Sequence, residues 1–490
     1  MMKYPPATLA TSALVLAVSA AVYGQEKTVI APGKSAPASP GLVNEWLRGE
    51  SAAFNAWDIG GQFRARWELK ENGGSDTKYG SEDFMKAPPV GKFNDNSFLY
   101  LREKVHIGYT PCEWLNLYAE GRDSSSTGDR RNPNPGADAF DLHQANLSLG
   151  NLKEFPITAK IGRQELAYGE ERMVGAADWG NLGRSFDAAK LRFENKQVWV
   201  DAFVGRVVMP ANHEFNEPND YDFLSGVYAS SKTLIPVQES QVYFLSHNAS
   251  GASTPAADPS WIGSPSKPQD IITIGLRAKS LPGKLGAWDY TAELAGQFGR
   301  VTGKIGAATA RLDQEALNIC LSGGYTWKDA TWSPRVGVGY DFASGDGNPN
   351  DGKSGTFELL FPTNHRHYGQ MDVVSQRNIH DPRVNISVKP AKGLSVSLDY
   401  HAFFLADTQD YFYPEAGSGR ASNGYGLHPG YSSFVGTELD LDATYTIKPW
   451  AVVRAGYAHF FVGDYITQSL AAKGGAQDAD WVYLQTVISF

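Results

Sequence analysis

The chain has 490 residues, of which 42% are hydrophobic, 12% aromatic and 20% charged, and its formal net charge is −9. This acidic balance, with an isoelectric point near 5.6, argues against a nucleic-acid-binding protein. With only two cysteines, Cys112 and Cys320, the sequence supports neither a disulfide framework nor a cysteine-based metal cluster.

The first 24 residues have the pattern of an export signal. Lys3 precedes an apolar segment, residues 10–21, which is too short to span a bilayer and is followed by small residues. A buried N-terminal helix is the alternative. We predict cleavage after Gly24, a periplasmic lead-in over residues 25–56 and a membrane domain over residues 57–490.

Residues 57–70 form the first strong strand pattern. Apolar side chains and glycines, from Trp57 to Leu69, occupy alternate positions, and polar side chains such as Arg64 and Arg66 lie between them. An alternation with a period of two predicts a β-strand with one apolar face. This pattern suits a soluble β-sandwich as well as a membrane barrel, so the whole set of strands has to decide between them.

Similar segments recur to the end of the chain and give about 18 strands, each long enough to cross a bilayer at a tilt. We predict these further strands at about residues 97–109, 114–123, 142–151, 157–165, 186–194, 197–207, 222–231, 237–247, 270–279, 287–298, 315–327, 332–343, 378–389, 393–405, 435–447, 450–461 and 479–490.

The connections alternate strictly between short turns, such as Lys448-Pro449, and long loops. This alternation is typical of periplasmic turns and extracellular loops, and it predicts an all-β fold: a transmembrane antiparallel up-and-down β-barrel with both termini in the periplasm. The long loops are expected at about residues 71–96, 124–141, 166–185, 208–221, 248–269, 299–314, 344–377, 406–434 and 462–478.

The last strand, residues 479–490, also alternates and ends on Phe490 without a polar tail. A barrel has to pair its last strand with its first, because an open sheet edge cannot face lipid. We therefore predict pairing with residues 57–70, which would place Arg64 and Arg66 on one side of the last strand and Arg454 on the other. A soluble sugar-binding β-protein is the alternative.

The polar parity of each strand predicts the residues that line the lumen. Arg163 departs from this rule because it shares the parity of Ile161, and a bulge at Gly162 would be needed to turn it inward; Glu103 falls on the lipid parity, where a carboxylate is costly. The candidate pore-lining, substrate-binding residues are Arg64, Arg66, Arg102, Lys104, Arg122, Arg163, Lys190, Arg192, Glu194, Asp399, Glu438, Asp440 and Arg454.

Arginines on a pore wall bind carboxylates and phosphates through paired N–H donors. Nearby acidic groups limit the affinity at each position, and passage requires weak, repeated sites. This chemistry favours an anionic ligand, although the charged interior of any porin is an equally good account of the same residues.

Several stretches resemble the alginate-export family of outer-membrane proteins. The resemblance is carried by residues 160–167 (KIGRQELA), 343–352 (ASGDGNPNDG), 356–369 (TFELLFPTNHRHYG) and 436–445 (GTELDLDATY), together with residues 185–192, 456–463 and the terminal strand. It implies an 18-stranded barrel that exports an anionic uronate polymer, with Arg64, Arg102, Arg163 and Arg454 in a basic constriction. The turn at Lys448-Pro449 departs from the family, whose founding members have a long turn there that covers the periplasmic mouth.

Other motifs are weaker. Asp346, Asn348, Asn350 and Asp351 offer oxygen ligands at alternate positions of a calcium-type loop, but the EF-hand spacing fails and a turn-rich loop explains them better. The group His365, His367 and Asp372 is a weaker metal candidate, better explained by polar loop contacts. Finally, Ser397, Asp399 and His401 share one strand face, but nothing supplies an oxyanion hole, so a hydrolase is disfavoured.

The sequence thus predicts a non-enzymatic outer-membrane channel, without a cofactor, for an anionic polysaccharide such as an alginate-like uronate polymer. The alternative is a general or solute-selective porin for small molecules. The expected partners are the anionic cargo, outer-membrane lipid and periplasmic export proteins, with no nucleic acid.

Overall fold

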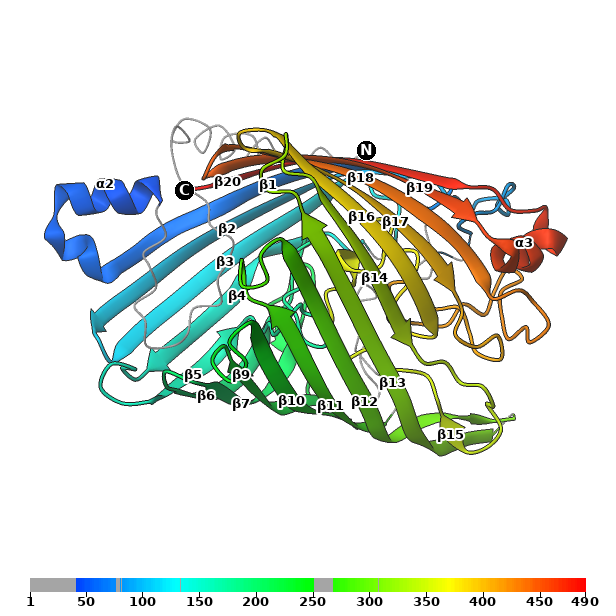
Figure 1. Ribbon diagram of the computed structural model, residues 1–490, viewed down its shortest axis with the longest axis horizontal. Coiled ribbons are helices and arrows are strands. Elements are labelled where there is room, and N and C mark those ends of the chain that lie inside the picture. Colours follow the sequence, from blue (N-terminus) through cyan, green and yellow to red (C-terminus); the bar gives the residue numbers. More distant parts are fainter. Residues whose placement is uncertain (1–40, 76–79, 81, 133, 251–267, 307) are drawn as a thin grey trace.

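A closed barrel of antiparallel strands makes up most of the molecule (Figure 1). The computed structural model describes residues 41–75, 80, 82–132, 134–250, 268–306 and 308–490. The predicted signal segment therefore lies outside the described residues. Among the described residues, no helix is long and apolar enough to cross a membrane.

Eighteen described strands form the wall, as the sequence predicts, and the two-residue strands β8 (Glu217–Pro218) and β15 (Lys353–Ser354) lie in its connections. The wall strands are β1 (Trp57–Glu71), β2 (Asn96–Cys112), β3 (Leu115–Thr127), β4 (Asp138–Leu149), β5 (Ile157–Gln164), β6 (Phe186–Glu194), β7 (Trp199–Met209), β9 (Asp222–Ser231), β10 (Gln238–Ala249), β11 (Gln269–Ser280), β12 (Trp288–Ile305), β13 (Ala308–Thr326), β14 (Arg335–Ala343), β16 (Ile379–Ala391), β17 (Leu394–Phe404), β18 (Phe434–Lys448), β19 (Ala451–Val462) and β20 (Ala479–Ser489).

The predicted closure between the first and last strands is confirmed. Strand β20 pairs antiparallel with β1 on one side and with β19 on the other. In this register Gln485 lies directly between Arg66 and Arg454. The seam of the barrel therefore brings basic side chains from both ends of the sequence to one stretch of the lumenal wall.

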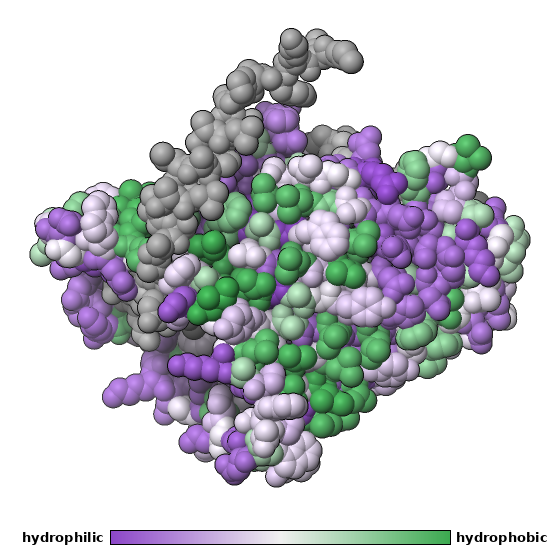
Figure 2. All heavy atoms as spheres, turned by 90° about the horizontal axis from the view of Figure 1, so that it is seen from above, coloured by the Kyte–Doolittle hydropathy of each residue, from purple (hydrophilic) through white to green (hydrophobic). Residues whose placement is uncertain are grey.

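Most of the outer face of the wall is apolar, as the alternation predicts. Side chains that point outward are well exposed. Examples are Leu99 and Val105 of β2, and Leu191, Leu294 and Leu484 on other strands. Figure 2 shows hydrophobic side chains gathered over the middle of the visible wall, with hydrophilic ones dominant toward the end that carries the long loops. This distribution matches a barrel that crosses a bilayer.

One predicted loop is wrong. Residues 299–314 were expected to be irregular, but β12 and β13 continue through them and pair from Trp288–Tyr325 to Ile305–Ala308. Glycines at positions 299, 303 and 306 gave this segment the composition of a loop, whereas cross-strand pairing extends the two strands beyond their neighbours (Figure 1).

A short helix, α2 (Leu42–Glu50), covers an exposed strand edge beside the seam. Strand β1 begins before β20 can pair with it, so the backbone groups of Trp57 and Ile59 on that side lack a partner strand. The Asn44 side chain accepts a hydrogen bond from the Ile59 amide (2.7 Å), and Arg48 donates one to the Trp57 carbonyl (2.7 Å). Helix α2 thus replaces the missing strand with side-chain bonds.

We predict that Asn44→Ala lowers the free energy of unfolding by about 1–2 kcal/mol, because it removes the acceptor of a partly buried backbone N–H. Urea unfolding of the barrel in detergent micelles measures this change. The matched control is Glu45→Ala, whose side chain is exposed in the same helix. Equal stability of the two variants would contradict an edge-covering role for α2.

Candidate functional site

Two long loops fold into the lumen and narrow it. They are the β5–β6 loop (residues 165–185) and the β14–β16 loop (residues 344–378). A parallel bridge between Val174 and Phe361 joins them, and backbone hydrogen bonds continue this pairing to Glu171 and Thr363. The two loops therefore form one unit inside the barrel.

One side of the lumen is filled by a hydrophobic core. Val174 and Phe361 from the loops pack against inward side chains of β6, β7 and β10, among them Phe186, Phe203 and Leu245, all nearly inaccessible to solvent. These strands carry apolar residues on both faces where the loops cover them. The cavities described below lie toward β1, β2 and β16–β20.

The basic side chains of β1 and β2 bind the backbone of the β5–β6 loop. Arg64 donates to the carbonyls of Asp178 (2.6 Å) and Gly180 (2.8 Å), and Arg66 donates to the carbonyl of Trp179 (2.6 Å). Arg102 contacts the Asp178 carbonyl at 3.2 Å and its carboxylate at 3.0 Å. Each interaction is a charge-assisted hydrogen bond, worth about 1.5–3 kcal/mol.

Acidic side chains of β18 hold the other loop through the opposite backbone groups. Glu438 accepts the Met371 amide (2.8 Å), and Asp440 accepts the Gln370 amide (3.3 Å). Gly369, with φ +79°, lies so close that a Cβ atom there would meet the Glu438 carboxylate. The cationic wall therefore binds carbonyls and the anionic wall binds amides.

Glu170 is a further anchor of the β5–β6 loop. Its carboxylate bonds Arg277 of β11 and Lys279 (2.7 Å) and lies 3.5 Å from Arg366 of the β14–β16 loop. Burial alone would raise the pKa of Glu170, but the hydrogen bond from Lys279 and the charges of Arg277 and Arg366 outweigh it and lower the pKa to about 2. The carboxylate stays ionised and ties both loops to the wall.

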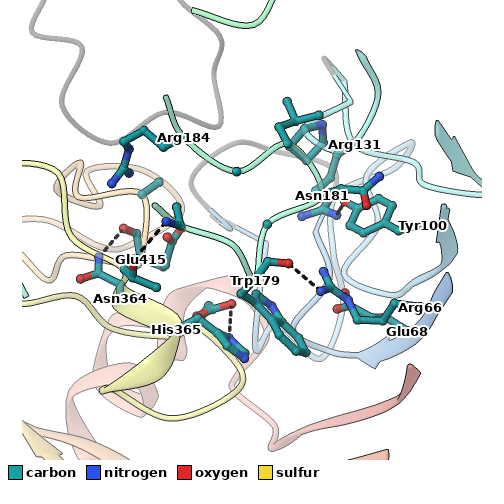
Figure 3. A pocket seen from close by; sticks show the side chains of 18 of the residues that line it. Arg66, Glu68, Tyr100, Arg131, Trp179, Asn181, Arg184, Asn364, His365 and Glu415 are labelled. Atoms are coloured by element: carbon teal, nitrogen blue, oxygen red, sulfur yellow. Dashed lines mark hydrogen bonds and ion pairs between the residues drawn. The ribbon is translucent and has the colours of Figure 1, made fainter. Parts of the chain in front are cut away.

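Two cavities remain beside the anchored loops. The smaller, of about 240 Å³, lies between the upper part of β1 and β2 and the loops at the long-loop end; Figure 3 shows Arg66, Tyr100 and Glu415 around it. The larger, of about 530 Å³, is lined by residues of β1 and β16–β20 together with both inserted loops. Trp179, Thr363 and His365 line both cavities and therefore separate them.

The larger cavity contains cations with solvent-accessible guanidinium groups. Arg454 has 39% of its side chain exposed and lies 3.7 Å from Asp442, and Arg366 is 55% exposed. Acidic groups, including Asp399 and Asp440, face the same space. This mixture suits weak and reversible binding of an anion.

The candidate pore residues divide into those that line these cavities and those that do not. Arg64, Arg66, Asp399, Asp440 and Arg454 line one of the two cavities. Two others, Arg102 and Glu438, lie behind them and hold the loops.

A second group of predicted residues is committed to ion pairs within the wall. Arg122 bonds Asp138 and the Leu182 carbonyl. Lys190 and Arg192 share Asp201, at 3.7 and 2.5 Å, beneath the loop residue Tyr168. Glu194 follows Arg192 at 3.6 Å at the short-turn end of β6.

Lys104 lies in a charged cluster with Glu120 (3.6 Å) and Glu165 (3.4 Å), and His143 bonds Glu165 (3.1 Å). The three groups Glu120, His143 and Glu165 are close enough to share a metal ion. However, the Lys104 ammonium already lies beside both carboxylates and would repel a second cation, which makes the cluster a poor metal site. Strand parity does not reveal this cluster, because Glu165 has the outward parity of Ile161 in the strand predicted at residues 157–165, whereas in the structure it follows the end of β5.

Arg163 corrects one part of the sequence analysis. The β4–β5 register passes through Gly162 without a shift in the described residues, so the bulge predicted there is absent. The Arg163 guanidinium bonds Asp187 (2.8 and 3.1 Å), which shares the outward parity of Leu191, and stacks over Phe215. Arg163 therefore points outward, as its place in the strand alternation predicts, and it lies on the outside of the strand wall beneath the 210–220 loop.

In the weaker metal motifs, the oxygen atoms bond backbone amides. Asp346, Asn348 and Asp351 each accept an amide two residues further along the chain, and Asn350 accepts the Gly306 amide. These are turn-stabilising bonds, and calcium binding there stays a prediction.

The residues of the second metal motif do not all converge, and neither do those of the hydrolase motif, because some of them bond partners outside the motif. His365 does meet Asp372, but His367 instead bonds the Glu170 carbonyl. In the hydrolase motif, His401 pairs with Asp381 and Asp399 accepts from Asn385.

Sequence reasoning missed the residues that shape the constriction. Asp178, Trp179, Thr363 and Arg366 come from loops whose path no strand pattern indicates. Trp179 stands between Asp178 and Gly180 in a segment with several glycines, and a lone large aromatic residue in such a loop is the one signal that could have marked it.

These features define an outer-membrane β-barrel channel with an internal constriction. The sequence model of the family described as alginate export matches residues 69–477. The chain belongs to this family. The family and the barrel together support the coarse function of an outer-membrane channel. No curated protein sequence matches the chain.

Solved structures confirm the fold. The crystal structure of Acinetobacter baumannii OccAB4 is 11% identical, with a TM-score of 0.54, covering 89% of this chain and 98% of that one. Pseudomonas aeruginosa OccK1 (OpdK) is 13% identical, with a TM-score of 0.53 and coverage of 88% and 98%. P. aeruginosa OccK11 (OpdR) is 14% identical, with a TM-score of 0.51 and coverage of 88% and 96%. At these identities the likeness concerns the fold alone.

We predict that the packing of the loops at the long-loop end depends on pH through Glu415. Burial, and next the charge of Asp372, raise the pKa of Glu415 from 4.5 to about 8, although Arg184 opposes the shift. Between about pH 4.5 and 8, the Glu415 carboxyl is deprotonated in the released loop but stays protonated in the packed loop. Packing therefore weakens as pH rises through this window and is constant outside it.

Limited proteolysis of the 405–433 loop in the folded barrel tests this. The ratio of the wild-type cleavage rate to the Glu415→Gln rate should be higher at pH 8 than at pH 5, because the variant has no carboxyl group at this position to titrate. The control, Glu214→Gln in another exposed loop, should follow the wild type. A constant ratio of wild-type to Glu415→Gln cleavage across this range would refute the assignment.

Proposed function

We propose that this protein is an outer-membrane diffusion channel for small anionic solutes, with sugar acids as the substrate class. The observation that carries the proposal is the pair of cavities left beside firmly anchored loops. The larger cavity, of about 530 Å³, lies within the size range of small-molecule sites. Such a cavity suits small solutes better than a wide open pore would.

The anchoring of the loops supports small solutes over polymers. Arg64, Arg66 and Arg102 together make several charge-assisted bonds to the β5–β6 loop, and Glu438 and Asp440 bind the other loop. At about 1.5–3 kcal/mol for each bond, release of the loops costs far more than a single weakly bound solute supplies. The wide path that a polymer needs is therefore expensive to open.

The charges that remain accessible support an anion. Arg454 and Arg366 present guanidinium groups to the larger cavity, and a guanidinium binds a carboxylate through two parallel N–H donors. Asp399 and Asp440 in the same cavity limit the affinity, so that bound solute can leave.

Export of an alginate-like uronate polymer is the second candidate function, and membership of the alginate export family favours it. It requires both inserted loops to leave the lumen together. In either case the long loops are expected outside the cell and both termini in the periplasm.

We predict that Arg454→Ala weakens block by glucuronate about five- to tenfold in planar bilayers, which corresponds to about 1–1.4 kcal/mol. The loss follows from removal of the accessible guanidinium at the seam. Arg311→Ala is the matched control, because Arg311, on the β12–β13 hairpin, pairs with Asp270 of β11 and lines neither cavity.

The same recordings separate the two candidate functions. Block by glucuronate monomers at low conductance supports the small-solute channel. A large conductance that only uronate polymers interrupt supports polymer export. Cation selectivity with no response to monomer or polymer would sink both versions.

A further inference from the structure

The wall between the two cavities is made of three side chains that differ in how firmly they are held. Trp179, Thr363 and His365 are the residues that both cavities share. A direct path from one cavity to the other passes these three residues. The freedom of each side chain therefore decides where a passage can open.

Thr363 is fixed within the loop unit. Its hydroxyl donates to the Glu171 carboxylate (2.7 Å) and accepts the Ala177 amide (3.1 Å). These two bonds join the β14–β16 loop to the β5–β6 loop. Movement of Thr363 would separate the two loops, so this side chain is a static part of the partition.

Trp179 is also fixed. The Arg66 guanidinium lies 3.9 Å from the centre of its ring and also binds its carbonyl. The rings of Trp481 and Tyr483 pack edge-on against it at 6.0 and 5.3 Å. The indole is therefore held on several sides by the wall of the barrel.

His365 is held by much less. Its ring stacks on Trp179 with centroids 3.9 Å apart and an angle of 7° between the planes (Figure 3), and Trp481 lies edge-on to it at 6.0 Å, but no cation holds it as Arg66 holds Trp179 in the described residues. Its Nδ1 atom lies 3.0 and 3.1 Å from the two carboxylate oxygens of Asp372. The His365 side chain is 14% exposed and lines both cavities.

We propose that the His365 side chain is the gate of this channel, and that Asp372 is its latch. Rotation of the imidazole away from Trp179 joins the two cavities while both loops stay anchored. Rotamer changes of this kind are fast compared with loop release. The gate deepens the proposed function, on which it rests, by placing the control of passage in one side chain.

The position of Asp372 supports this role. Asp372 has φ +60°, a left-handed conformation in which aspartate is enriched among residues other than glycine. It lines the smaller cavity and is absent from the lining of the larger one. The latch therefore draws the ring toward the long-loop side, and a carboxylate solute that enters from there can compete with Asp372 for the same imidazole nitrogen.

Single-channel recording in potassium chloride tests the gate. We expect His365→Ala to raise the conductance at least twofold and to abolish brief closures, because the partition loses its movable part. His365→Trp should lower the conductance, because a larger ring fills the gap. Asp372→Asn should increase the frequency of open–closed transitions severalfold while the open conductance is unchanged.

The matched control is His428→Ala. His428 also stacks on an aromatic ring, Tyr431 (4.2 Å), and makes one hydrogen bond, but it lines neither cavity. Folding of each variant is checked by its migration in detergent gels with and without boiling.

Unchanged conductance and closures in both folded His365 variants would overturn the gate. Because these recordings contain no uronate, failure of the gate is distinct from failure of the proposed function, which the glucuronate block decides. If His365→Ala fails to fold, the opposite change expected for His365→Trp still tests the proposal.

Discussion

The structure depends on one physical constraint: backbone inserted into a barrel needs partners for its carbonyl and amide groups. Arg64, Arg66 and Arg102 supply donors to the carbonyls of residues 178–180, and Glu438 and Asp440 supply acceptors for the amides of Gln370 and Met371. Opposite charges on two walls thus bind opposite backbone groups. The same contacts remove these charges from bulk water at a cost that only such hydrogen bonding offsets.

This arrangement changes the meaning of the charged lumen. Basic residues on inward parity suggest a surface that an anion meets directly, yet most of them here serve the loops. Arg122 binds Asp138 and the Leu182 carbonyl, and Arg192 binds Asp201 beneath Tyr168. The charges left for a solute are those with incomplete ion pairing and exposed guanidinium groups, of which Arg454 is the clearest.

Strand alternation predicts the wall because its physical cause is local. Lipid on one face and a polar interior on the other impose a period of two, and even the juxtaposition of Arg66, Gln485 and Arg454 followed from pairing the first and last strands. Parity was also the better guide at Arg163, where the added bulge was wrong. The hairpin over residues 299–314 escaped prediction because cross-strand pairing overrode a glycine-rich composition.

The loop paths could not be predicted because their cause is not local. Nothing in residues 165–185 shows that carbonyls 178–180 meet arginines more than 75 positions earlier in the chain. Within the constriction, the contacts of each side chain decide whether it is held in place or can rotate. Trp179 is held by a guanidinium, the rings of Trp481 and Tyr483 and its own carbonyl, whereas one carboxylate and the rings of Trp179 and Trp481 hold His365. The strength of the loop anchoring is thus the reason to look for motion in a side chain.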